Sequence, residues 1–142
     1  MNLSSSMVVG ARNWRKICQT TLVSYGISEA CAVPLLMIGR LGEGVRQVTV
    51  AQAAGMESPS LVRLLDQLCH AGYVCRTEDA QDRRAKCLSL TDSGRTLVQA
   101  VEVELVRLRS EVLEGIDARD LEATLRVLKA FESAGQAPVL YP

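Results

Sequence analysis

The sequence predicts a mainly α fold whose central part is an α+β winged helix-turn-helix. Three observations lead to this prediction. First, residues 49–71 read as two short helices separated by Gly55. Second, the apolar period changes from helical to alternating after Gly72. Third, a charged tip separates two alternating segments, so a two-stranded ribbon follows the helices.

Length and composition limit the class of protein. A chain of 142 residues with 48% hydrophobic residues can bury one core, so we expect a single domain over residues 1–142. The longest uncharged apolar run, residues 30–39, is about half as long as a membrane span, and no basic leader precedes an apolar block. Five cysteines without a C-x-x-C pair indicate neither disulfides nor zinc. We expect a cytoplasmic protein without a membrane segment, metal or other cofactor.

Charge is divided unevenly along a chain whose formal net charge is zero. Residues 1–91 carry 10 Lys or Arg against 7 Asp or Glu, a net charge of +3, whereas residues 92–142 carry 6 against 9, a net charge of −3. The positive part contains the predicted helix-turn-helix and suits contact with phosphates, while the acidic part would be kept away from them.

Two helices are predicted in the first third of the chain. After a loose start at residues 1–6, apolar side chains recur at helical spacing until Gly26. This stripe consists of Trp14, Ile17, Cys18, Thr21, Leu22 and Tyr25. Ser28 then caps a second helix that reaches Leu41. Pro34 inside that helix would cost about 3 kcal/mol, so we expect a late start or a kink.

A short strand and a short helix precede the central helix. Residues 47–49 are expected to pair with the hairpin as a strand. Thr49 followed three residues later by Gln52 matches a capping box, which predicts a helix over residues 50–54.

The central helix has a marked start and a clear apolar stripe. Ser58 offers a hydroxyl N-cap, and Pro59 suits the first helical position. Four leucines share one face of this helix: Leu61, Leu64, Leu65 and Leu68. Arg63 therefore faces away from the core.

The ribbon is predicted from residues 73–78 and 86–90, with a polar tip at residues 79–84. Cys75 and Cys87 lie symmetrically about Gln81, so we expect them to face each other across the hairpin. Such a pair would suit a redox switch, whereas the alternative is two small apolar side chains.

Two long helices follow the ribbon. Residues 91–93 cap the first, whose stripe consists of Leu97, Val101, Leu105, Leu108 and Val112. Asp117 caps the second, whose apolar face consists of Leu121, Leu125, Leu128 and Phe131. These stripes are longer than one small core needs, so residues 7–25 and 93–134 are predicted as N- and C-terminal dimerisation helices around a winged helix-turn-helix at residues 28–91.

These patterns resemble the MarR family of bacterial transcriptional regulators, in particular its SlyA-like branch, over most of the chain. The resemblance rests on residues 59–68, Gly72, the Asp-Arg-Arg-Ala-Lys run at residues 82–86, Leu90-Thr91, Gly94 and Asn13-Trp14-Arg15. It implies a homodimeric repressor that binds a pseudo-palindromic operator in double-stranded DNA and is released by a small effector, often an aromatic acid. It also implies that Arg84 is a wing arginine held by Asp82. The expected DNA-binding residues are Ser58, Ser60, Arg63, Asp82, Arg83, Arg84 and Lys86.

An effector site is expected at the first helix. Trp14 puts an aromatic ring beside the cations Arg15 and Lys16, and Cys18 lies one turn further on. We therefore take Trp14, Arg15 and Cys18 as candidates for binding a small aromatic carboxylate. A place for Trp14 in the core or in the dimer interface is the alternative.

Two other classes of function are weaker. An enzyme needs converging acids, bases or nucleophiles, and this chain has one histidine, no metal-ligand spacing and no phosphate-binding glycine loop, so we expect no catalysis. A cysteine-based redox sensor of the same fold stays open. A winged helix that binds only proteins is disfavoured by Arg63 and the Arg83-Arg84 pair.

Overall fold

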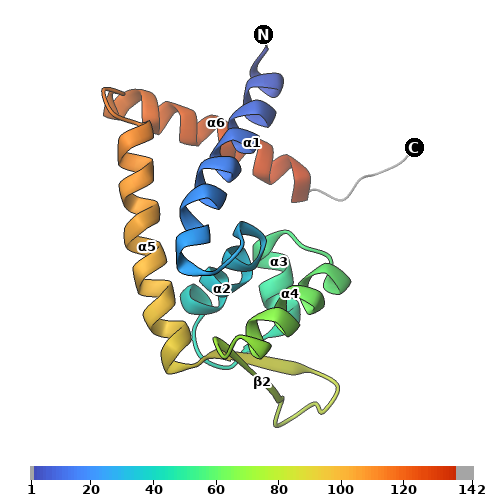
Figure 1. Cartoon of the computed structure of the whole chain (residues 1–142). Coiled ribbons are helices and arrows are strands. Elements are labelled where there is room, and N and C mark those ends of the chain that lie inside the picture. Colours follow the sequence, from blue (N-terminus) through green and yellow to red (C-terminus); the bar gives the residue numbers. More distant parts are fainter. Residues whose placement is uncertain (1, 137–142) are drawn as a thin grey trace, which may run out of the picture. The chain divides into compact units, whose positions relative to one another are not determined.

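The computed structural model describes residues 2–136, which are mainly helical (Figure 1). The elements in chain order are α1 (Leu3–Leu22), the 3-10 helix η1 (Val23–Tyr25), α2 (Glu29–Leu41), β1 (Val45–Arg46), α3 (Gln47–Ala54), α4 (Ser58–His70), β2 (Val74–Glu78), β3 (Lys86–Leu90), α5 (Asp92–Val112) and α6 (Ala118–Gln136). The chain forms two compact units, one up to Leu108 and one from Arg109 onward. A single domain over the whole chain stays a prediction.

A three-stranded antiparallel sheet with the order β1-β3-β2 forms the wing. β2 and β3 pair from Val74 opposite Leu90 to Glu78 opposite Lys86. The loop between them, residues 79–85, is the wing tip. The hairpin extends away from α2, α3 and α4 in Figure 1. This arrangement confirms the predicted fold class, a mainly α fold with a winged helix-turn-helix between further helices.

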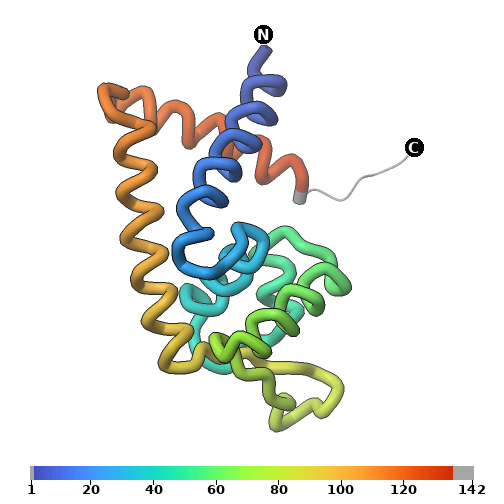
Figure 2. The backbone as a smooth tube through the Cα atoms, viewed as in Figure 1, coloured from blue at the N-terminus to red at the C-terminus, as the bar shows by residue number. Residues whose placement is uncertain are grey.

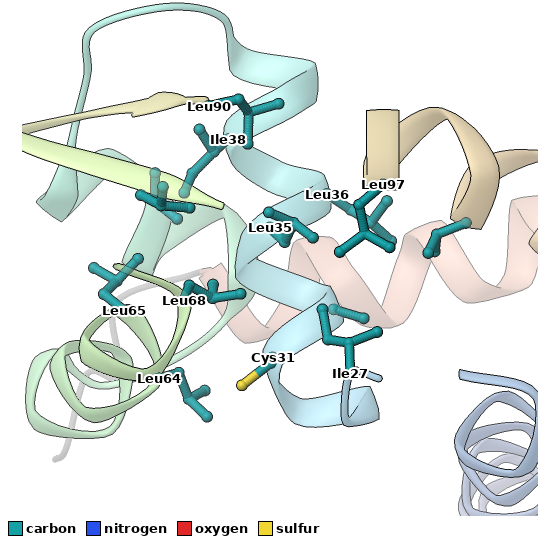
Figure 3. Close-up of a cluster of buried hydrophobic side chains, with 14 of the residues drawn as sticks. Ile27, Cys31, Leu35, Leu36, Ile38, Leu64, Leu65, Leu68, Leu90 and Leu97 are labelled. Atoms are coloured by element: carbon teal, nitrogen blue, oxygen red, sulfur yellow. The ribbon is translucent and has the colours of Figure 1, made fainter. Parts of the chain in front are cut away.

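One hydrophobic core joins the helix-turn-helix to the sheet (Figure 3). The four α4 leucines predicted to share a face are each 5% exposed or less. In Figure 3 Leu64, Leu65 and Leu68 approach the side of α2 that carries Cys31, Leu35 and Ile38. Burying a side chain of this size contributes about 1.5 to 3 kcal/mol. The stripe therefore determines which face of α4 turns outward.

Helix α1 starts earlier than predicted. Residues 1–6 were expected to be loose, but the helix begins at Leu3 because the Asn2 side chain accepts a hydrogen bond from the Ser5 N–H at 3.0 Å. Met1 lies outside the described residues. Gly26 ends the following turn with a φ of 70°, as predicted. The smooth trace in Figure 2 shows the chain turning there into α2.

Helix α2 confirms its predicted cap and end; of the two alternatives predicted for Pro34, the late start is wrong and the kink stays a prediction. The Ser28 hydroxyl accepts from the Cys31 N–H at 3.1 Å, so the helix begins at Glu29 and places Pro34 in its interior. Pro34 is fully buried there. Among the described helices none alone is long and apolar enough to cross a bilayer, although α1 with η1 and α2 meet that test as a pair bent by 82°.

The start of α3 corrects two predictions. Residues 47–49 are helical, and the strand is Val45–Arg46 instead. The Thr49 capping box is wrong, because α3 begins at Gln47 with Arg46 in the N-cap position and without a side-chain cap. Only Val45 and Arg46 pair with β3, so the strand stops at Arg46 and the chain continues directly into the helix. Gly55 ends α3 in the left-handed conformation, as predicted.

A tight junction connects the end of α4 to the start of α5. The Thr91 N–H donates to the Tyr73 carbonyl at 3.0 Å, and the Thr91 hydroxyl donates to the Gly72 carbonyl at 2.6 Å. The same hydroxyl accepts from the Gly94 N–H at 3.0 Å and so caps α5. Gly94 lies so close that an added Cβ would be 2.0 Å from the Tyr73 carbonyl oxygen.

The second unit consists of the end of α5 and α6. The Asp117 carboxylate accepts from the Arg119 N–H at 2.8 Å, which confirms the predicted cap of α6. Two of its apolar residues, Leu125 and Phe131, are 56% and 47% exposed in the single chain. The other two residues of this face, Leu121 and Leu128, are half-buried.

Candidate nucleic-acid interface

Helix α4 presents a polar outer face and an uncapped N-terminus. Ser58 is its first residue rather than its N-cap, because the helix starts one residue earlier than predicted, and the N-cap Glu57 makes no side-chain hydrogen bond. Pro59, with no N–H to satisfy, lies in the first turn. Ser60 and Arg63 are exposed. Free N–H groups and the positive end of the helix dipole make such a terminus suited to an anion.

A cavity of about 370 Å³ opens between the start of α3, the start of α4 and the wing. It is lined by Arg46, Gln47, Val48, Ser58, Asp82, Arg84, Ala85 and Lys86. Helix α3 also starts here without a side-chain cap, so two helix N-termini open near the same space. The cavity therefore brings together predicted residues of α4 and of the wing that are far apart in sequence.

Asp79 organises the wing tip. Its carboxylate accepts hydrogen bonds from the N–H groups of Gln81 at 2.8 Å and Asp82 at 3.2 Å, and from Arg46 Nε at 3.0 Å. Cys87 Sγ donates to the same carboxylate at 3.6 Å. Asp79 thus ties the tip to the strand that precedes α3. Sequence reasoning did not single out Arg46 or Asp79, whose contact spans 33 positions and leaves no local signal.

The network around Asp79 predicts a specific acid sensitivity. The N–H of Gln81, followed by the N–H of Asp82 and the Arg46 guanidinium, holds the pKa of Asp79 below its ordinary value of 3.8. A lowered folded-state pKa contributes stability that is present above the unfolded-state value and is lost as the pH falls through the folded-state value. Asp79→Asn should therefore reduce the loss of stability between about pH 5 and pH 2, as measured by urea unfolding at each pH. Equal acid sensitivity in the wild type, Asp79→Asn and the control Asp82→Asn would contradict this.

One predicted cation of this surface has an acidic partner, and the other three have none among the described residues. Lys86 Nζ pairs with Glu78 across the hairpin at 3.4 Å. Arg63, Arg83 and Arg84 have no ion pair with any described residue and are exposed. Asp82 does not hold the Arg84 side chain as the resemblance implied, because its carboxylate accepts from the Arg84 backbone N–H at 3.0 Å. That bond shapes the tip and leaves the guanidinium available.

The predicted effector residues lie on α1 but differ in exposure. Trp14 is half-buried and packs against the core, Arg15 is exposed, and Cys18 is a core residue at 5% exposure. Tyr73 lines two further cavities, of about 180 and 470 Å³, and none of these three residues lines either of them.

The cysteines do not form the predicted pair. Cys75 is opposite Ser89 and Cys87 is opposite Thr77, so the two cysteines are not directly opposed. The hairpin is centred on position 82 rather than Gln81, which shifts the register. Burial and the neighbouring Asp79 carboxylate raise the pKa of the Cys87 thiol, and burial raises the pKa of Cys69. Both shifts disfavour the reactive thiolate.

Comparisons with known proteins agree with this architecture. A family model described as "ArnR1-like, winged-helix domain" matches residues 19–108. The solved structure of transcriptional regulator PA3341 is 32% identical, covers 94% of this chain and 97% of its own, and has a TM-score of 0.84. A MarR-family transcriptional regulator from Rhodococcus sp. RHA1 is 26% identical over 92% of this chain and 95% of its own, with a TM-score of 0.79.

A third relative shows the fold with ligands. The transcriptional repressor CouR bound to a 23-mer DNA duplex is 23% identical over 92% of each chain, with a TM-score of 0.81. CouR from Rhodococcus jostii RHA1 is also known bound to p-coumaroyl-CoA. None of these comparisons assigns a branch, so the SlyA-like assignment stays a prediction. The family match and the similarity to two transcriptional regulators above 25% identity establish that this chain belongs to the MarR family of winged-helix transcriptional regulators.

Proposed function

We propose that this protein is a transcriptional repressor that binds a pseudo-palindromic operator in double-stranded DNA as a cytoplasmic homodimer. The observation that carries the proposal is that α4 and the wing meet at one cavity beside two uncapped helix N-termini and carry the exposed cations Arg63, Arg83 and Arg84, unpaired among the described residues. In a winged helix-turn-helix the second helix enters the major groove, and basic residues of an arm can enter the minor groove. No catalytic role is proposed.

The proposed DNA contacts follow from this geometry. Ser58, Ser60 and Arg63 lie on the exposed side of α4, and Arg83 and Arg84 extend from the wing tip. Asp82 shapes the tip through the Arg84 backbone. Lys86 contributes less charge because Glu78 already pairs with it.

The test compares one selected duplex with random duplexes. Selection from a random library, followed by fluorescence anisotropy at about 150 mM salt, should give a specific affinity at least about 10³-fold tighter than random DNA. Equal affinity for both would reject specific readout, and no binding to either would reject the DNA-binding function.

The dimer proposal rests on apolar side chains that each unit leaves in solvent. On α1, Leu3 and Val8 are 55% and 68% exposed, and on α6, Leu125 and Phe131 are exposed. Burying such stripes against a second copy would present two recognition helices to half-sites about one helical turn, roughly 34 Å, apart. Light scattering at micromolar concentration should show a dimer, and a monomer there would exclude this arrangement.

Arg84→Ala should weaken DNA binding and make its salt dependence shallower. A subunit that makes one phosphate contact fewer releases fewer counterions on binding, so the magnitude of the negative slope of log K against log [salt] should decrease by about 0.9 per subunit. The measurement is affinity at four or more salt concentrations. Arg126→Ala on α6 is the matched control and should leave the slope unchanged. A slope that is the same for Arg84→Ala and the wild type would exclude this wing contact.

We also propose that a small aromatic carboxylate controls DNA binding from α1. Trp14 supplies an aromatic surface next to Arg15, and the neighbouring Cys18 belongs to the core that continues into the helix-turn-helix. A ligand there changes DNA affinity only if it prefers one spacing of the two recognition helices. A coupling of about 1 to 3 kcal/mol would change DNA affinity roughly 5- to 150-fold, and DNA would weaken ligand binding by the same factor.

Calorimetric titration of benzoate-like acids into free and operator-bound protein tests both halves of this linkage. The variants that test the site are Trp14→Leu and Arg15→Gln. Each should weaken ligand binding, and neither should change DNA affinity in the absence of ligand. If no acid binds below millimolar concentration, while peroxide abolishes DNA binding reversibly and Cys→Ser changes prevent this, redox sensing replaces the ligand proposal.

A further inference from the structure

Val62 occupies an unusual position on α4. Every leucine of this helix is buried, whereas Val62 is 36% exposed and is the one large aliphatic side chain of α4 that reaches solvent. Single exposed apolar residues are common on protein surfaces, so exposure alone carries no functional meaning. The residues one turn before and after Val62 show where it points.

Ser58, Val62 and Asp66 form a row at spacings of four residues, so they lie along one edge of α4. Ser58 lines the cavity that α4 shares with Arg84 and Lys86 of the wing. At the other end of the row, the Asp66 carboxylate accepts from Arg76 Nη1 of β2 at 3.0 Å. Val62 therefore lies on the edge of α4 that faces the wing, yet the wing does not cover it.

The groups around Val62 restrict what it can contact. Asp66 is held by Arg76, and Arg63, the next residue along α4, is unpaired and exposed. Both Val62 and Arg63 belong to the N-terminal half of α4, and N-terminal residues of a recognition helix contact base edges. Val62 has no hydrogen-bonding group, so any contact that it makes in the major groove is apolar. The only apolar group on the major-groove edge of a base pair is the C5-methyl group of thymine.

We propose that Val62 reads the methyl group of one thymine per half-site, within about one base step of the base pair that Arg63 contacts. This inference rests on the proposed function, because it needs α4 in the major groove. It adds a specificity-determining residue and the class of base that this residue selects.

The experiment removes only the methyl group. Each thymine of the selected duplex is replaced singly by deoxyuridine, which pairs with adenine in the same way, and affinity is measured at constant salt. For the wild type we expect one position in each half-site to lose affinity by about fourfold, the loss expected for one buried methyl group. For Val62→Ala the affinity for the unmodified duplex should be lower, and the sensitivity at that position should disappear.

Val23→Ala is the matched control, because it makes the same change at another exposed valine. Val23 is 63% exposed and lies on η1, outside the helix-turn-helix. It should keep the wild-type pattern of deoxyuridine sensitivity. A wild type that binds its selected duplex specifically but shows no sensitive thymine, or a Val62→Ala variant that keeps the sensitivity, overturns the Val62 assignment alone. A wild type that selects no sequence overturns the proposed function and this inference with it.

Discussion

Arg63→Ala is expected to lower operator affinity by about 1 to 3 kcal/mol per half-site, which corresponds to roughly 5- to 150-fold. Arg63 is exposed on α4 and has no ion pair with any described residue, so its guanidinium is free to donate two hydrogen bonds to a guanine edge. Affinity for random duplexes should change much less, because nonspecific binding depends on the sum of phosphate contacts. Fluorescence anisotropy with the selected and random duplexes at one salt concentration measures both.

Arg63→Lys is the decisive companion to this variant. It keeps the charge but loses the planar fork, so it should bind random DNA like the wild type and still lose most of the preference for the operator. Arg83→Ala on the wing tip serves as a second control, with a similar loss on both duplexes. If Arg63→Ala weakens binding to operator and random DNA equally, Arg63 is a phosphate contact and does not read a base.

Gly94→Ala is expected to destabilise the folded protein by about 3 kcal/mol and to lower its melting temperature by roughly 10 °C. The added methyl group would lie 2.0 Å from the Tyr73 carbonyl oxygen and 3.0 Å from its carbon. That carbonyl cannot simply move aside, because it accepts the Thr91 N–H at 3.0 Å. Thermal unfolding followed by circular dichroism measures the effect.

Gly10→Ala provides the matched control for this change. Gly10 also lies within a helix, but a Cβ there would meet nothing within 4 Å. Replacing a glycine by alanine at an open helical position should stabilise the protein by about 0.5 to 1 kcal/mol. If Gly10→Ala raises the melting temperature and Gly94→Ala lowers it, the Gly94 effect comes from the contact with Tyr73. A Gly94→Ala variant as stable as the wild type would show that the junction between α4 and α5 can open at little cost.

Several parts of the site were predictable because their signals are local. The leucine stripe of α4 repeats with the helical period, and the left-handed φ of 81° at Gly72 is a conformation that glycine adopts without strain. The strand Lys86–Leu90 also agrees with its alternating pattern. These signals place Arg63 on the outer face of a helix and Arg84 on a hairpin tip.

Other predictions were wrong where contacts with distant residues override local preference. Thr49 and Gln52 match a capping box, but pairing of β1 with β3 lets α3 begin at Gln47 instead. Cys75 and Cys87 looked opposed because the hairpin centre was placed one residue too early. The Arg46–Asp79 contact, at 3.0 Å, joins a strand to the wing tip and has no pattern in the sequence that announces it.

By itself the sequence determined the order of the main helices and of the hairpin, the glycine stops at Gly26, Gly55 and Gly72 and the outward face of α4, because helical and strand periods depend only on neighbours along the chain. The tertiary structure alone decided how these faces meet. It placed Ser58 and Arg84 around one cavity and gave Asp79 its partners. It also left Val62 exposed on the edge of α4 that faces the wing. Such contacts depend on strand register and on the packing of α4 against the core, and both are set by interactions between residues far apart in the chain.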